Sequence, residues 1–198
     1  AGAVGGVLIG LITEYYTGST PVEKIAKSGE TGPATVMITG LSVGMQSVVL
    51  PILILATIIL VSTSLVGLYG VGIAAVGMLA TVGITMAIDA YGPVADNAGG
   101  IAEMSGMGSE TREITDSLDE LGNSTAAIGK GFAIGAAALA ALAIIAAFVE
   151  TVSHNNEQFE LVLSDPQVLV GMFIGISIPF LISSITMTAA VSYTHLRA

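Results

Sequence analysis

The sequence contains no cysteine and only two histidines. Without cysteine there is no disulfide framework and no thiolate metal site, and two histidines do not suit a structural zinc site. Basic residues are also scarce, with five Lys and Arg against 15 Asp and Glu and a net charge of −10. Because those five are scattered along the chain, we expect no binding to the phosphate backbone of nucleic acid.

Charged residues of either sign are few, at 10% of the 198 residues, whereas 53% are hydrophobic and the mean hydropathy is +0.88. Soluble domains have about 25% charged residues. No charged residue occurs from Thr31 to Ile88, which is too long for one membrane span of about 20 residues. A buried soluble pair of helices would need to be apolar all round, which is uncommon in small proteins. The chain is therefore predicted to be an integral membrane protein.

We expect an all-α fold, a polytopic membrane helix bundle with about five transmembrane helices. The predicted helices cover residues 1–15, 33–65, 71–105, 115–149 and 166–190. Pro51 and Pro93 lie inside the second and third of these and predict kinks. The third and fourth helices have about 35 residues, roughly 50 Å, so they should project beyond a hydrocarbon layer of about 30 Å. Glycines four residues apart predict close helix packing, at 40 and 44, 131 and 135, and 171 and 175.

The few basic residues predict the orientation. Lys24 and Lys27 lie in the first predicted loop and Arg112 lies in the third, whereas the fourth loop has four acids and no Lys or Arg. By the positive-inside rule the first and third loops are cytoplasmic. The polar ends of the third and fourth helices then face the cytoplasm together.

Those polar ends contain rows of oxygen-bearing side chains. Asp89 and Asp96 are seven residues apart and lie on one helix face, and Glu103 continues the row. On the next helix one stripe contains Asp119, Asn123, Ala126 and Lys130, and Asp116 lies seven residues before Asn123. Carboxylate and amide oxygens suit a hard cation such as Mg²⁺, and a lysine supplies a point charge for phosphate. We interpret the charged residues of the intervening turn as solvated surface, namely Glu110, Arg112 and Glu113.

Two stretches resemble a known family. DAYGPVADNAGGIAEM, from Asp89 to Met104, and LDELGNSTAAIGKGFAIGAAAL, from Leu118 to Leu139, closely resemble the membrane-integral inorganic pyrophosphatases, which are pyrophosphate-energised ion pumps. The resemblance runs from near the start to about Met187 and covers about the ninth to thirteenth helices of a sixteen-helix protein. It implies hydrolysis of Mg²⁺-loaded pyrophosphate, coupled to pumping of Na⁺ or H⁺, in a homodimer. In bacteria this implies the inner membrane, with the active site on the cytoplasmic side.

The resemblance also implies roles for residues. Asp96 matches an aspartate that binds metal-pyrophosphate and helps to hold the attacking water, so it is the candidate catalytic residue. Asn123 matches a substrate-side asparagine, and Lys130 matches the lysine of the IGKG motif. Asp89 opens the DAYGP motif, so the expected Mg²⁺ ligands are Asp89, Asp96 and Asn123.

One position separates subfamilies. Potassium-independent members resemble GNTTKA, with a lysine ammonium where this sequence has Ala126, followed three residues later by Gly129. The likeness is therefore to the K⁺-dependent subfamily, with Ala126 and Gly129 as determinants of K⁺ dependence. Without the ammonium a cation is needed beside phosphate, so the expected K⁺ site comprises Asp119, Asn123 and Ala126.

The chain is predicted to be an internal part of a longer protein, because it opens on AGAVGGVLIG without a basic leader and lacks the family's other ligand-bearing helices. We expect residues 1–190 to be a partial pyrophosphatase bundle and 191–198 to be a non-native tail. Because the other ligand-bearing helices are missing, we expect the chain alone to be inactive.

Two alternatives remain. A secondary transporter would bind a small anion at broken helices near mid-bilayer, and a non-catalytic scaffold would rely on glycine packing alone. Polar residues at one end of the helices favour the pump.

Overall fold

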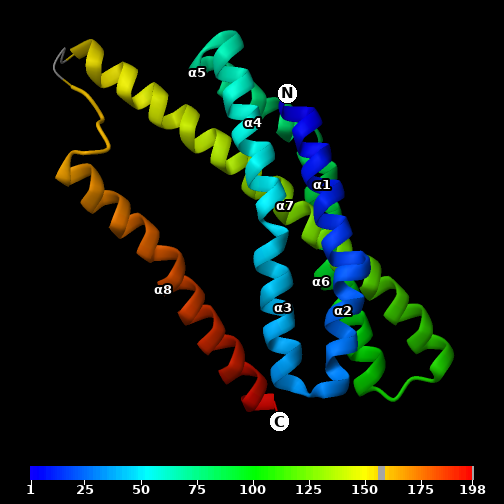
Figure 1. The fold of residues 1–198 in the computed structure, drawn as a ribbon. Helices are drawn as coiled ribbons and strands as arrows, with labels where there is room; N and C mark the ends of the chain where they lie inside the picture. Colours follow the sequence, from blue (N-terminus) through cyan, green and yellow to red (C-terminus); the bar gives the residue numbers. More distant parts are fainter. Residues whose placement is uncertain (156–158, 198) are drawn as a thin grey trace. The chain divides into compact units, whose positions relative to one another are not determined.

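The computed structural model describes residues 1–155 and 159–197, and every regular element in those ranges is a helix. The described chain divides into two compact units, 1–146 and 147–198. The division falls inside the longest helix, so each unit is considered by itself (Figure 1).

The first unit begins with a helix pair that the sequence only half predicted. Helix α1 covers Gly2–Gly18, and a nine-residue amphipathic helix, α2, covers Thr20–Ser28 where we expected a loop. Pro21 in the first turn of α2 has the φ angle that a helix start requires, and Lys27 in the last turn complements the helix dipole. These local signals explain the extra helix. A short 3₁₀ turn, η1 (Gly29–Thr31), then leads to α3.

The second predicted helix is confirmed, and it is interrupted close to Pro51. Helix α3 covers Pro33–Ser47 and α4 covers Val49–Val66, and the two together are long and apolar enough to span a membrane. The break falls just before Pro51, because the proline ring conflicts with the carbonyl four residues earlier and its nitrogen carries no hydrogen. That carbonyl belongs to Ser47, the last residue of α3.

The third predicted helix is bent, but not where we expected. It comprises α5 (Leu68–Met78), a 3₁₀ turn η2 (Leu79–Thr81) and α6 (Val82–Met104), with 52° between α5 and α6. Helix α6 continues through Pro93 without interruption, so the kink expected at that residue stays a prediction. Nothing in the three residues of η2 explains the bend.

Helices α7 and α8 are longer than predicted. Helix α7 covers Ser109–Asn155, 47 residues or roughly 70 Å, and α8 covers Pro166–Arg197. In the described ranges three helices are long and apolar enough to cross a membrane, or four if α5 and α6 form one bent span. The membrane class is confirmed, with fewer full spans than the five expected, because α1 has only 17 residues.

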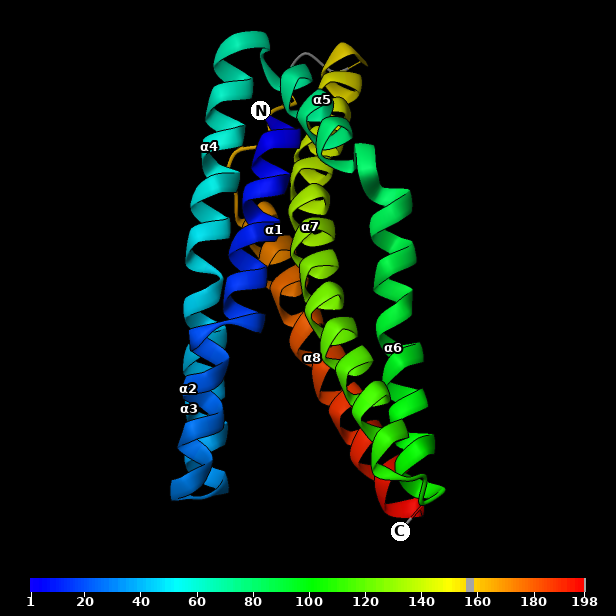
Figure 2. The same ribbon diagram turned by 90° about the vertical axis from the view of Figure 1, so that its right-hand side faces the viewer.

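The core of the first unit forms where α1, α4, α5 and α7 meet (Figure 2). Ile9, Val71, Met78 and Leu139 are completely buried there. Helix α1 contributes a glycine face, and a Cβ on Gly6 would lie 2.6 Å from the ring of Phe132. The close approach that this face allows fixes α7 in place beside α1.

The second unit contains the end of α7 and α8. The Phe148 and Phe159 rings pack edge to face at 5.8 Å, and Ser153 Oγ donates a hydrogen bond to the Phe159 carbonyl. Asp165 caps α8 by accepting from the Gln167 amide at 2.8 Å. The α8 backbone continues through the predicted tail as far as Arg197.

Candidate functional site

Helices α6 and α7 form an antiparallel hairpin whose polar ends meet at a short turn (Figure 2). Gly106 has φ +64° in that turn, a conformation that glycine adopts without strain. The helices touch at Gly92 and Gly122. A Cβ on Gly92 would lie 2.9 Å from the Gly122 carbonyl oxygen, and one on Gly122 would lie 3.0 Å from Gly92 Cα. Glycine at both positions therefore sets how closely the two backbones approach.

This contact also fixes which way the polar rows face. The α6 residues turned toward α7 are buried, among them Gly92 and Ala95, and the Asp89 row lies about a quarter-turn to one side. On α7 the row that contains Asn123 also lies about a quarter-turn from Gly122, rotated in the same direction about its own helix axis. Because the helices are antiparallel, both rows line one side of the hairpin. This polar side comprises Asp89, Asp96 and Glu103 from α6 and Arg112, Asp116, Asp119 and Asn123 from α7.

Asp96 and Asn123 both lie on the polar side, near the contact between Gly92 and Gly122. Asp96 is four residues from Gly92 toward the turn and Asn123 is one residue from Gly122 away from it, so the two are about one helical turn or more apart along the hairpin. Asp96 is exposed and forms no polar contact with another residue in the part of the chain that the structure describes. Its carboxylate is thus available to an external ligand.

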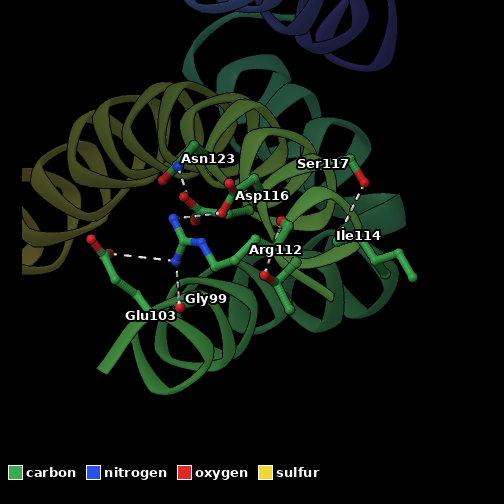
Figure 3. Close-up of polar contacts among 9 residues, drawn as sticks. Gly99, Glu103, Arg112, Ile114, Asp116, Ser117 and Asn123 are labelled. Atoms are coloured by element: carbon green, nitrogen blue, oxygen red, sulfur yellow. Dashed lines mark hydrogen bonds and ion pairs between the residues drawn. The ribbon is translucent and has the colours of Figure 1, made fainter. Parts of the chain in front are cut away.

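Asp119 and Asn123 form the pair expected from their spacing (Figure 3). The Asn123 Nδ2 group donates a hydrogen bond to Asp119 Oδ1 at 3.1 Å. The amide oxygen of Asn123 takes no part in this bond, and the residue is exposed. Carboxylate and amide oxygens are thus presented together, one turn apart.

Asp89 and Ala126 lie at the contact between the helices. A Cβ on Gly129 would lie 3.1 Å from Asp89 Oδ1, so the carboxyl group rests against bare α7 backbone. The methyl group of Ala126 lies 3.2 Å from where a Cβ on Gly92 would be. Lys130 belongs to α7, but its side chain lies outside the described part of the structure.

Arg112 was interpreted incorrectly from sequence. Its turn is the first turn of α7 rather than a loop, and the side chain is only 31% exposed. Nη1 donates to the Gly99 carbonyl at 2.9 Å and to Glu103 Oε2 at 3.4 Å, and Nη2 pairs with Asp116 Oδ1 at 3.1 Å (Figure 3). The four-residue spacing of Arg112 and Asp116 was the available signal. No spacing in the sequence predicted the hydrogen bond from Arg112 to the Gly99 carbonyl of α6.

A cleft of about 520 Å³ lies beside the polar side, between α7 and the junction of α1 with α2. Asp116, Asp119 and Asn123 line it from α7, and Thr17 and Ser19 line it opposite. Every polar group named here presents oxygen. The cleft therefore suits a hydrated cation or a cation-bound anion.

The donor chemistry fits Mg²⁺ or K⁺, although the described residues alone do not form a closed cage. No group of three His, Cys, Asp or Glu side chains converges within the described ranges. Mg²⁺ commonly uses one or two carboxylates and completes its shell with water and substrate phosphate. Asp89, Asp96 and Asn123 could supply such a partial set, since all three lie on the polar side.

Comparison with known proteins decides the family. The family model described as inorganic H⁺ pyrophosphatase matches residues 1–195. The chain belongs to this family. The resemblance that the two motif stretches indicated is therefore confirmed, and with it the assignment as an integral membrane protein.

The relatives differ in whether they are described as stimulated by K⁺ or insensitive to it. The chain is 52% identical over 197 residues to a putative K⁺-stimulated pyrophosphate-energized sodium pump of Clostridium tetani, covering 94% of this chain and 29% of the relative. It is 46% identical to a protein of the same description from Bacteroides thetaiotaomicron, covering 95% and 31%. It is also 46% identical to a K⁺-insensitive pyrophosphate-energized proton pump of Methanosarcina mazei, covering 96% and 29%. The chain thus spans about a third of the length of these relatives.

Proposed function

We propose that the whole protein containing this chain hydrolyses Mg²⁺-bound pyrophosphate and uses the released free energy to pump Na⁺ or H⁺ across a membrane. Family membership supports this proposal, as does the similarity to relatives described as pyrophosphate-energized ion pumps. The observation that carries it is the position of Asp96 and Asn123 on the same side of the α6–α7 hairpin, near the Gly92–Gly122 contact. Substrate can then contact both helices at once.

In the proposed mechanism Asp96 has two tasks. Together with Asp89 and Asn123 it would hold Mg²⁺, which when bound neutralises phosphate charge and orients the phosphates. A carboxylate oxygen of Asp96 would also accept the proton of the attacking water, an effect worth about 10²–10⁴-fold in rate. Lys130 would provide a positive point charge for the substrate phosphate.

Coupling would follow from the continuity of α6 and α7. Both helices run from the polar side into apolar sequence, and α7 extends for 47 residues. A change in the separation of the polar ends on hydrolysis would therefore move segments inside the membrane. Substitution of Asp96 by Ala in the whole protein should abolish phosphate release and pumping together.

We further propose that the protein requires K⁺. The paired Asp119 and Asn123 side chains present oxygens to a cation, and Ala126 supplies no ammonium to replace it. Two relatives are described as K⁺-stimulated, which supports this assignment, and a third is described as K⁺-insensitive. Potassium must therefore be varied directly in any assay.

We place the polar side in the cytoplasm of a bacterial cell, at the inner membrane, in a homodimer. The orientation rests on the basic residues of α2 and the start of α7, because cytoplasmic segments carry the excess of Lys and Arg. We propose Na⁺ rather than H⁺ as the pumped ion, since both relatives described as K⁺-stimulated are described as sodium pumps.

The test is phosphate release from Mg²⁺-pyrophosphate by the whole protein in sealed vesicles, with and without K⁺. Repeating the assay across Na⁺ concentrations while recording the internal pH identifies the pumped ion. We expect K⁺-stimulated phosphate release that is lost in the Asp96→Ala variant and kept in a Glu113→Gln control. Anion uptake without phosphate release would instead indicate a secondary transporter.

A further inference from the structure

Arg112 connects the two helices of the hairpin at the end nearest the turn. Its guanidinium contacts α6 twice, at the Gly99 carbonyl and at Glu103, and α7 once, at Asp116. The shortest bond, 2.9 Å, goes to the backbone of α6 rather than to a side chain. A bond to backbone fixes the position of the helix itself.

The segment that Arg112 holds is intrinsically weak. Gly99 and Gly100 are consecutive glycines inside α6, and glycine is a poorer helix former than alanine. A Cβ at either position would meet no atom within 4 Å, so no packing contact of the hairpin depends on the missing side chains. The external bond from Arg112 therefore restrains a turn whose helix propensity is low.

Asp96 lies between two points of attachment. On one side, one turn away, Gly92 touches the Gly122 backbone. On the other side, three residues away, the Gly99 carbonyl accepts from Arg112. With both attachments present, the Asp96 backbone has a defined height relative to Asn123. With the second removed, the glycine turn can shift and Asp96 with it.

We propose that Arg112 is a positioning residue that sets the height of the Asp96 carboxylate against Asn123. The inference rests on the proposed function, in which Asp96 accepts the proton of the attacking water. Arg112 acts here without touching substrate, because its described contacts are directed at Gly99, Glu103 and Asp116. Arginine suits this task because its planar fork can hold several acceptors in fixed directions, which lysine cannot do.

The test uses the whole protein in vesicles and compares Arg112→Gln and Arg112→Lys with Glu113→Gln. Glu113 lies in the same turn, is exposed, and forms no polar contact in the part of the chain that the structure describes. Rates are measured over a range of Mg²⁺-pyrophosphate concentrations, so that kcat and KM are obtained separately. Thermal unfolding in detergent, with and without Mg²⁺ and methylenebisphosphonate, reports folding and ligand binding.

A displaced carboxylate should lower kcat more than it raises KM. A misplacement of about 1 Å can cost about 100-fold in rate, so we expect Arg112→Gln to lower kcat by about 10- to 100-fold, with KM changed less than about threefold. Arg112→Lys should restore only part of the rate. In an Asp96→Asn background Arg112→Gln should have almost no further effect on kcat, because the group that it positions is already lost.

Several results would overturn the inference. Raised KM with unchanged kcat would make Arg112 a direct substrate ligand, and full rescue by Arg112→Lys would reduce its role to charge. If Arg112→Gln fails to fold, the test rests on Arg112→Lys. A kcat equal to that of the wild type in Arg112→Lys would then refute the inference. Absence of phosphate release by the wild-type protein refutes the proposed function itself. Phosphate release by the wild type, with Arg112→Gln behaving like Glu113→Gln, refutes only the role of Arg112.

Discussion

Substituting Gly92 with Ala should separate α6 from α7 and reduce activity. The added Cβ would lie 2.9 Å from the Gly122 carbonyl oxygen and 3.2 Å from Ala126 Cβ. Ordinary carbon–oxygen contacts start at about 3.3 Å, so the two atoms must move apart by roughly half an ångström. The oxygen belongs to helix backbone and cannot rotate away. The helices themselves must therefore shift.

The size of the effect follows from two opposing contributions to the free energy of unfolding. Overpacking costs about 1–3 kcal/mol, and replacing glycine by alanine inside a helix stabilises it by up to about 1 kcal/mol. A net loss of about 0–3 kcal/mol is expected. Activity should fall further, by about tenfold in kcat/KM, because a displacement of half an ångström is large for a site shared between two helices.

Gly100→Ala is the matched control. Gly100 lies on the same helix, and a Cβ there would meet no atom within 4 Å. The variant gains helix propensity without a clash, so its melting temperature should equal or exceed that of the wild type. Phosphate release and thermal unfolding of both variants are measured in the whole protein. Wild-type kcat/KM for Gly92→Ala would refute the reasoning about the helix contact.

Three further substitutions give distinct outcomes. Gly129→Ala places a Cβ 3.1 Å from Asp89 Oδ1. Because a carboxyl group can rotate, we expect only a two- to fivefold loss of kcat/KM, about 1 kcal/mol or less. An increase in kcat/KM would contradict the placement of Asp89. Ala126→Lys introduces an ammonium and should abolish stimulation by K⁺, as measured by phosphate release over a K⁺ titration, and unchanged stimulation would exclude this position from the K⁺ site. Asp119→Ala removes the acceptor of Asn123 Nδ2 and should raise the K⁺ concentration for half-maximal activity by about tenfold, or about 1.4 kcal/mol, with an unchanged value counting against the pair as a ligand.

The sequence predicts much of the fold because membrane spans depend on simple quantities. Length, hydropathy and the absence of charge locate the helices, and the chemistry of Pro51 locates one break. Helix α2 was missed because its nine residues are too few and too polar to resemble a span. The bend at η2 could not be predicted, since the residues Leu79–Thr81 include neither proline nor glycine.

The candidate site likewise has features that the sequence predicts and features that it does not. Helical spacing alone predicts the Asp119–Asn123 hydrogen bond and places Asp89 and Asp96 on one face. The rotation of α6 against α7 cannot be read from spacing, because it depends on which glycines meet, here Gly92 and Gly122. The role of Arg112 was missed for the same reason, since its main acceptor is a backbone carbonyl of another helix.

The most direct measurement is an experimental structure of the whole protein with Mg²⁺ and methylenebisphosphonate, a non-hydrolysable analogue of pyrophosphate. We expect the analogue between α6 and α7 on the polar side, with a metal ion within ligand distance of an Asp96 carboxylate oxygen and with the Asn123 amide facing the same phosphates. Binding of the analogue elsewhere, with the side chains of Asp96 and Asn123 facing lipid or away from each other, would contradict the proposed site.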